Sequence, residues 1–194
     1  MNRTLLALIV TITGCSDCRT IMSSTIPALQ SAGPEFQYEP IQCDTDIATP
    51  APKQCIVKTL ACGDTVEGNT KVGHSKWGDD FYQKTFCTPQ RHDYDESPEI
   101  VYALEVPADV EATVRMDSDC ADLDVVAVSW NDTKQCPRTE HHIRINECEM
   151  DTSVGNGYVR MTTVTKAQTY LVGVDGKNGA TGNFRLTVRC TTYR

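Results

Sequence analysis

Apolar and polar residues alternate along much of the second half of the chain. From Val110 to Met116 every second residue is apolar and the residues between them are polar or small. Residues two apart in a strand point to the same face, so this pattern predicts a strand with one buried face. Segment 100–106 predicts another strand, which Pro107 ends, and weaker alternation predicts strands around 143–145 and 159–161.

Two further patterns suggest how these strands are arranged. Segment 123–130 is apolar on both faces, which is typical of a central strand in a sandwich. Segments 170–174 and 184–188 flank the Gly- and Asn-rich stretch 175–182 and predict a hairpin. Short strands spaced by about 10 residues, with no helical pattern between them, predict an all-β antiparallel sandwich of jelly-roll type.

The N-terminus carries a short apolar run, 5–12, that follows Arg3 and ends at Gly14 and Cys15. A run of this length is too short for a transmembrane helix, which needs about 20 residues, and is typical of a signal peptide. The stretch 12–15 resembles the lipobox of bacterial lipoproteins, which implies that Cys15 carries lipid. Two alternatives are a plain secreted protein with Cys15 in a disulfide, and half of a metal site with Cys18, although no second such pair completes four zinc ligands.

Residues 23–54 show neither a strand nor a helix period and contain five prolines. Such a segment buries too little apolar surface to offset its ordering entropy, so we expect an extended spacer in which Cys43 and Cys55 close a small loop. The expected organisation is a lipoprotein signal over 1–14, a tether over 15–58 and a sandwich domain over 59–194. We also expect the sandwich to fold without stabilisation from the tether.

Ten cysteines in 194 residues indicate an oxidising, extracytoplasmic compartment. The formal net charge of −8 and the lack of clustered Lys and Arg disfavour nucleic acid as a partner.

Six cysteines fall within the expected sandwich and are disulfide candidates. Cys62 and Cys190 bracket the domain, Cys136 and Cys148 flank one strand and turn, and two others remain, namely Cys87 and Cys120. Six cysteines allow about 15 pairings, among which we favour Cys136 with Cys148. A lipidated Cys15 leaves nine cysteines in the chain, and Cys18 is then the expected unpaired one.

Several phrases resemble one family, the bacterial pre-peptidase C-terminal domains and their stand-alone relatives in secreted proteins and lipoproteins. They occur in family order at 62–70, 78–82, 97–104, 121–126, 168–176 and 182–188. The resemblance implies a β-sandwich that serves as an accessory module without catalytic activity. Some relatives in collagenases bind calcium and matrix polymers, but their ligand positions do not map onto this chain.

An acidic stretch invites a calcium hypothesis of its own. Asp117, Asp119, Asp122 and Asp124 place four carboxylates within eight residues, and calcium takes six to eight oxygen ligands. Asp175 is an outside candidate. The alternative is a solvated acidic edge, since the stretch lacks the glycine and glutamate of a helical calcium loop. Apart from this possible calcium, we expect no cofactor.

The sequence offers little for catalysis. Adjacent His141 and His142 on a strand would point to opposite faces, and the other histidines, His74 and His92, are isolated. No hydrolase motif such as GxSxG or HExxH occurs.

We therefore expect a lipid-anchored, non-enzymatic cell-envelope module that presents a disulfide-stabilised sandwich to an unknown protein or glycan. Ser16 after the lipidated residue favours the outer membrane by resemblance to bacterial lipoproteins. The alternatives are a soluble secreted hydrolase accessory or inhibitor, and a purely structural envelope lipoprotein.

Overall fold

The computed structural model describes residues 36, 38–52, 55–85 and 92–192. The chain divides into two units, Met1–Gly33 and Pro34–Arg194, and all described residues belong to the second. The segments that carry Cys15, Cys18 and Cys87 lie outside the described residues.

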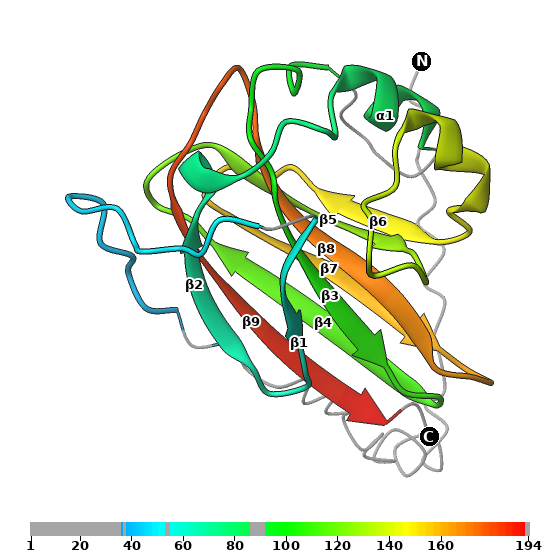
Figure 1. Cartoon of the computed structure of the whole chain (residues 1–194). Helices are drawn as coiled ribbons and strands as arrows, with labels where there is room; N and C mark the ends of the chain where they lie inside the picture. The colour runs from blue at the N-terminus through cyan, green and yellow to red at the C-terminus, as the bar shows by residue number, and fades with distance from the viewer. Residues whose placement is uncertain (1–35, 37, 53–54, 86–91, 193–194) are drawn as a thin grey trace, which may run out of the picture. The chain divides into compact units, whose positions relative to one another are not determined.

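Within the described residues, nine strands form two sheets, which confirms the expected all-β sandwich (Figure 1). The five-stranded sheet has the order β1-β3-β8-β5-β6 and the four-stranded sheet the order β2-β9-β4-β7. Neighbouring strands are antiparallel except for β1 and β3, which are parallel. The strands are β1 (Ile56–Leu60), β2 (Thr65–Asn69), β3 (Ile100–Val106), β4 (Val110–Asp117), β5 (Leu123–Ser129), β6 (Cys148–Asp151), β7 (Asn156–Thr163), β8 (Gln168–Gly176) and β9 (Asn183–Thr192).

The main core lies between the two sheets. On every long strand, alternate side chains point inward, as the pleat of a strand requires. Tyr102 and Phe184 meet edge to face across this layer, with ring centroids 6.3 Å apart. The inward residues of β4 are those that the alternation marked as apolar, namely Ala112, Val114 and Met116.

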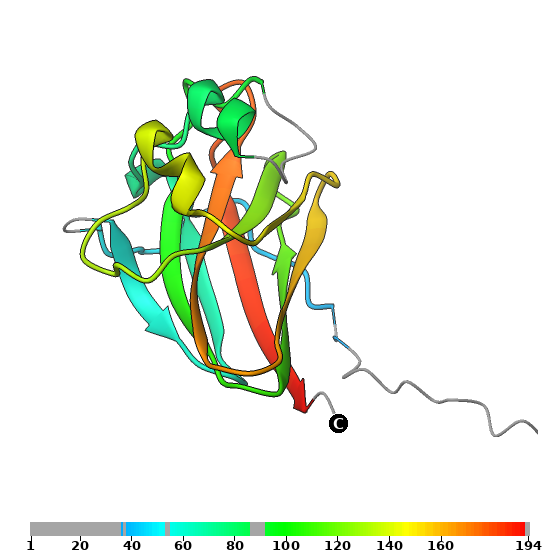
Figure 2. The same ribbon diagram turned by 90° about the vertical axis from the view of Figure 1, so that its right-hand side faces the viewer.

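A second apolar layer covers the outer face of the five-stranded sheet. The short helix α1 (Asp79–Lys84) and the 3-10 helix η3 (Thr139–Arg144) lie next to one another over this side (Figures 1 and 2). Trp77 stacks on Phe81 at 5.1 Å between ring centroids, and both are buried against outward residues of the sheet. Gly173 makes room for this indole, because a Cβ there would approach Trp77 Cζ3 to 2.4 Å.

Three expectations from the sequence are wrong in detail. The segment around 143–145 lies largely in η3, where Ile143 is exposed, rather than in a strand. The segments 170–174 and 184–188 belong to different sheets, because β8 pairs with β3 and β5 whereas β9 pairs with β2 and β4. Short helices also occur between strands: η2 (Thr70–Val72), α1 and η3.

Candidate functional site

Three of the four aspartates in the acidic stretch have protein partners, and these partners differ. Asp117 is buried and paired with the Arg115 guanidinium at 2.7 Å. Asp119 lies in the loop after β4, where it accepts hydrogen bonds from the Tyr38 hydroxyl at 2.7 Å and the Ile41 amide at 3.0 Å. These two carboxylates therefore serve local structure on the four-stranded side.

The other two aspartates point to the covered side of the five-stranded sheet. Asp124 is fully buried, accepts a 2.5 Å hydrogen bond from the Tyr94 hydroxyl and lies 3.3 Å from Lys177 Nζ. The Oδ1 atoms of Asp122 and Asp124 are buried without a hydrogen-bond partner. Within the described part of the chain, no three Asp, Glu, His or Cys residues are grouped as metal ligands. The expected calcium ligands are thus not brought together.

Asp124 belongs to a buried carboxylate–tyrosine cluster that sequence reasoning missed. Asp175 lies opposite it on β8 and accepts a 2.7 Å hydrogen bond from the Tyr82 hydroxyl of α1. Glu99 is also buried and accepts the Lys76 amide at 2.9 Å. Only Asp124 and Asp175 stood out in the sequence, because the other members come from segments with no shared motif.

Burial changes the protonation of this cluster. Desolvation raises the pKa of Glu99 from 4.5 to about 7 and that of Asp124 from 3.8 to about 6. Burial also raises the pKa of Asp175 well above its ordinary value, with the Glu99 charge adding to the effect. Since Asp124, Asp175 and both tyrosines are fully buried, the cluster can hold protons and fasten the covering layer but offers no opening to a substrate.

The histidines are engaged with the protein rather than with one another. His141 and His142 lie in η3, where His141 Nδ1 accepts the Arg138 amide at 3.1 Å. His142 Nδ1 lies 3.0 Å from the Thr139 carbonyl oxygen, and His74 Nε2 lies 3.0 Å from that of Pro52. These contacts agree with structural roles for the histidines.

A hollow of about 590 Å³ lies at one end of the sandwich, near the Cys62–Cys190 disulfide. Glu105 is the single ionisable side chain among the described residues that line it. It therefore lacks the paired acid and base, or nucleophile and base, that hydrolytic chemistry needs.

Three disulfides with both cysteines in the described residues join the early part of the chain to two later loops and to β9. Cys43 is bonded to Cys120, Cys55 to Cys136 and Cys62 to Cys190. The favoured pair Cys136–Cys148 is wrong, because the loop after β5 folds over the five-stranded sheet and carries Cys136 to buried Cys55. Cys148 is itself disulfide-bonded.

The expected small loop between Cys43 and Cys55 and a pairing of Cys87 with Cys120 are also wrong, since three of these cysteines have other partners. Disulfides of this kind place the domain in a secreted or cell-envelope setting. Among the helices described, none has both the length and the apolar character needed to span a bilayer.

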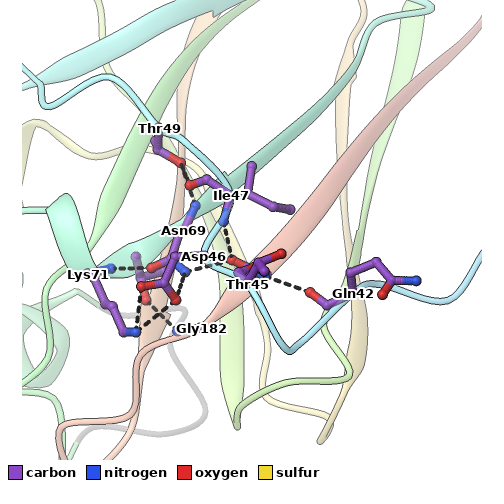
Figure 3. A network of polar contacts seen from close by, with 10 residues as sticks. Gln42, Thr45, Asp46, Ile47, Thr49, Asn69, Lys71 and Gly182 are labelled. Atoms are coloured by element: carbon purple, nitrogen blue, oxygen red, sulfur yellow. Dashed lines mark hydrogen bonds and ion pairs between the residues drawn. The ribbon is translucent and has the colours of Figure 1, made fainter.

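Residues 38–52, which we call the strap, lie against the sandwich although the sequence suggested a free tether. Asn183 of β9 binds the strap through its side chain. Its side-chain amide donates to the Gln42 and Thr45 carbonyl oxygens at 2.6 and 2.8 Å. The Asn183 side-chain oxygen accepts the Ile47 amide at 2.9 Å. Asn69 and Lys71 add contacts to Asp46, and Thr49 accepts the Asn69 amide (Figure 3).

The outer face of the four-stranded sheet is polar. Its strand register sets Thr113 of β4 between Arg189 of β9 and Arg160 of β7, and the next row contains Thr191, Glu111 and Thr162. We call six outward residues of this region the Thr/Arg face: Thr113, Tyr158, Arg160, Thr162, Arg189 and Thr191. Glu111 lies among them, 3.8 Å from the Arg160 guanidinium. All are exposed or half-buried, and the Arg160 guanidinium lies 5.9 Å from the centroid of the Tyr158 ring.

Two other arginines on this outer face contact the strap and Phe36. Arg185 is paired with Glu67 at 2.6 Å and donates to the Glu39 carbonyl oxygen at 2.8 Å. Arg115 donates to the Phe36 carbonyl oxygen at 3.3 Å and lies 5.9 Å from the Tyr38 ring centroid. The strap and Phe36 thus engage two of the four arginines on this sheet, and Arg160 and Arg189 lie on the Thr/Arg face.

Known proteins were compared with this chain at the level of sequence and of fold. No protein-family model and no curated protein matches it. The fold is similar to a pre-peptidase C-terminal domain. That domain belongs to a collagenase from Bacillus anthracis; the match has 12% identity and a TM-score of 0.37 and covers 73% of this chain and 100% of the other. The sequence phrases described above resemble the same family.

Proposed function

We propose that this protein is a lipid-anchored, non-enzymatic module of the cell envelope that binds a glycan through its Thr/Arg face. The main support for this proposal is that only one of the two sheets has its outer face buried. A second apolar layer buries the outer face of the five-stranded sheet, whereas the outer face of the four-stranded sheet presents hydroxyls, guanidinium groups and one tyrosine ring.

The chemistry of the Thr/Arg face favours a glycan over a protein partner. Protein interfaces bury an apolar core, and the single large hydrophobic residue of this face is Tyr158, which is 48% exposed. Threonine hydroxyls and arginine donors at regular strand spacing suit the hydroxyl groups of a sugar chain. The exposed ring suits stacking against the apolar face of a sugar.

A binding experiment tests this proposal. Immobilised cell-wall and matrix polysaccharides, together with a glycan array, should retain the protein, and Tyr158→Ala combined with Arg189→Ala should reduce binding at least tenfold. Arg138→Ala, an exposed arginine on the covered side, is the matched control and should bind normally. Retention that survives the double substitution would contradict the proposal, and no retention on any glycan would favour a protein partner or a structural role.

The anchor is supported by the sequence of the N-terminus. An apolar run followed directly by Gly14-Cys15 matches what lipid attachment requires. Cys15→Ser should therefore move the protein from the membrane fraction to the soluble fraction, whereas Cys18→Ser should not. An intact mass that shows an unmodified Cys15 or a retained signal peptide would favour the soluble, secreted alternative.

A further inference from the structure

The strap is attached to the sandwich mainly by polar contacts. Of its residues, only Ile41 and Pro52 are buried. Hydrophobic stabilisation scales with apolar area removed from water, so this segment gains little of it compared with a strand of the sandwich. Its amides and carbonyls bond instead to Asn183 and Asp119, and its Thr49 hydroxyl accepts the Asn69 amide.

Hydrogen bonds of this kind hold a segment weakly when water can replace them. Each exchanges protein–water bonds for protein–protein bonds, and the net gain is small. Most of the strap is exposed, so its groups return to water directly when it leaves. The receptor side chains Asn183 and Asn69, now buried under the strap, become accessible to water in the same step.

The Cys43–Cys120 disulfide adds a covalent attachment to these weak contacts in the middle of the strap. Cys43 is exposed and Cys120 half-buried, whereas Cys55 and Cys136 at the base of the strap are 2% and 6% exposed. A reductant that approaches through solvent therefore reaches the Cys43–Cys120 bond more readily than the Cys55–Cys136 bond.

We propose that the Cys43–Cys120 disulfide is a redox-controlled fastening of the strap. A dithiol reductant attacks one sulfur as a thiolate, forms a mixed disulfide and releases the other cysteine as a thiol. Its second thiol then resolves the mixed disulfide. Two electrons and two protons pass to Cys43 and Cys120, and the reductant becomes a disulfide.

Release of the strap has two consequences. Arg185 loses its contact with the Glu39 carbonyl oxygen, keeps its ion pair with Glu67 and becomes more exposed on the same outer sheet face as the Thr/Arg face. Residues 38–52 also become part of the tether, and 15 extended residues span up to about 50 Å. The Cys55–Cys136 bond stays closed and keeps β1 in place. This inference does not depend on glycan binding.

Hydrogen exchange on the full-length protein tests the proposal, with dithiothreitol as the dithiol. Differential alkylation should show that Cys43 and Cys120 are reduced before Cys55 and Cys136. The amides of Ile41, Ile47 and Asn69 should then exchange at least tenfold faster, while ladder amides such as Val114 should not change. The Cys43→Ser, Cys120→Ser double variant should show the same faster exchange of these strap amides without reductant. The control variant Cys18→Ser should exchange as the wild-type protein does.

Three results would overturn the proposal. One is reduction of Cys55–Cys136 before Cys43–Cys120. Another is strap protection that persists after Cys43 and Cys120 are reduced, because the polar contacts then suffice. The third is faster exchange throughout the ladder, since the bond would then stabilise the whole sandwich. Reduced wild-type protein gives each of these readouts even where the double variant does not fold.

Discussion

The two sheets of this sandwich differ in how many faces they bury. All seven residues of β5 in the five-stranded sheet are buried, whereas in β4 of the four-stranded sheet exposure alternates along most of the strand. The difference follows from the second apolar layer, which packs Trp77, Phe81 and Trp130 against only one of the sheets. A strand sequence that is apolar on both faces therefore indicates that a further layer covers its sheet, in addition to a central position in that sheet.

The largest expected effect comes from removing the strap together with part of β1. A chain that begins at residue 58 loses two disulfides, Cys43–Cys120 and Cys55–Cys136, and the first part of β1, an edge strand of the covered sheet. Because one native disulfide in a small secreted domain contributes about 2–5 kcal/mol, we expect a loss of more than about 4 kcal/mol.

Thermal unfolding against a chain that begins at residue 34 measures this loss. A decrease in Tm of more than about 10 °C is expected for a domain of this size. Equal melting temperatures would support the sequence-based expectation that the tether contributes nothing.

Removing a side chain from the covering layer should have the next largest effect. Trp77→Ala deletes a fully buried indole that stacks on Phe81 and donates to the Pro137 carbonyl oxygen at 3.1 Å. We expect the free energy of unfolding to fall by about 3–5 kcal/mol, measured by urea denaturation. A loss below about 1 kcal/mol would mean that this layer is not part of the folded core.

The buried carboxylates predict a pH dependence that belongs to the covered sheet alone. The folded pKa of Glu99, about 7, lies above its ordinary value of 4.5, so the folded state binds the proton more tightly. The stabilisation is complete below about pH 4.5 and is lost as the pH rises through 7. At 1.36 kcal/mol for each pKa unit, Glu99 contributes roughly 3 kcal/mol to this loss.

Urea denaturation between pH 4.5 and 8 tests whether the free energy of unfolding falls as the pH rises and whether Glu99 causes the fall. Glu99→Gln keeps an acceptor for the Lys76 amide and should flatten the decline. A stability that rises over this range would show that other groups dominate the linkage.

The smallest effect is expected on the outer face of the four-stranded sheet. Thr113→Ala or Arg189→Ala removes a side chain that is at least partly in water, so stability should change by less than about 0.5 kcal/mol. Calorimetry of these variants beside Trp77→Ala tests the contrast between the sheets directly. A fall of more than about 1.5 kcal/mol in the free energy of unfolding of Thr113→Ala would contradict this contrast.

These contrasts show which parts of the fold could be predicted from sequence. Alternation placed β3 and β4 within one residue of their ends, because a pleat with one buried face imposes a period of two. It could not identify partners across the sandwich, so β8 and β9 were expected to form a hairpin although they lie in different sheets. A turn sequence specifies a reversal but not whether the chain returns to the same sheet.

The site was harder to predict for a related reason. Asp117 and Asp124 are close in sequence, yet they lie on different sheets and bond to different groups. Glu99, Tyr82 and Tyr94 meet at Asp124 and Asp175 only after the chain folds, and no spacing indicates it. The disulfide pairing was hard to predict for the same reason, because the Cys55–Cys136 pair depends on how an irregular loop crosses a sheet.

The order of the disulfides along the chain also bears on how the protein matures. Three successive cysteines pair with three later ones in the same order: Cys43, Cys55 and Cys62 with Cys120, Cys136 and Cys190. A chain that emerges from its N-terminus exposes the thiols of Cys43, Cys55 and Cys62 to oxidation before their partners exist. An oxidant acting alone would join these near neighbours wrongly. Maturation therefore calls for an isomerase that reshuffles early bridges through mixed disulfides.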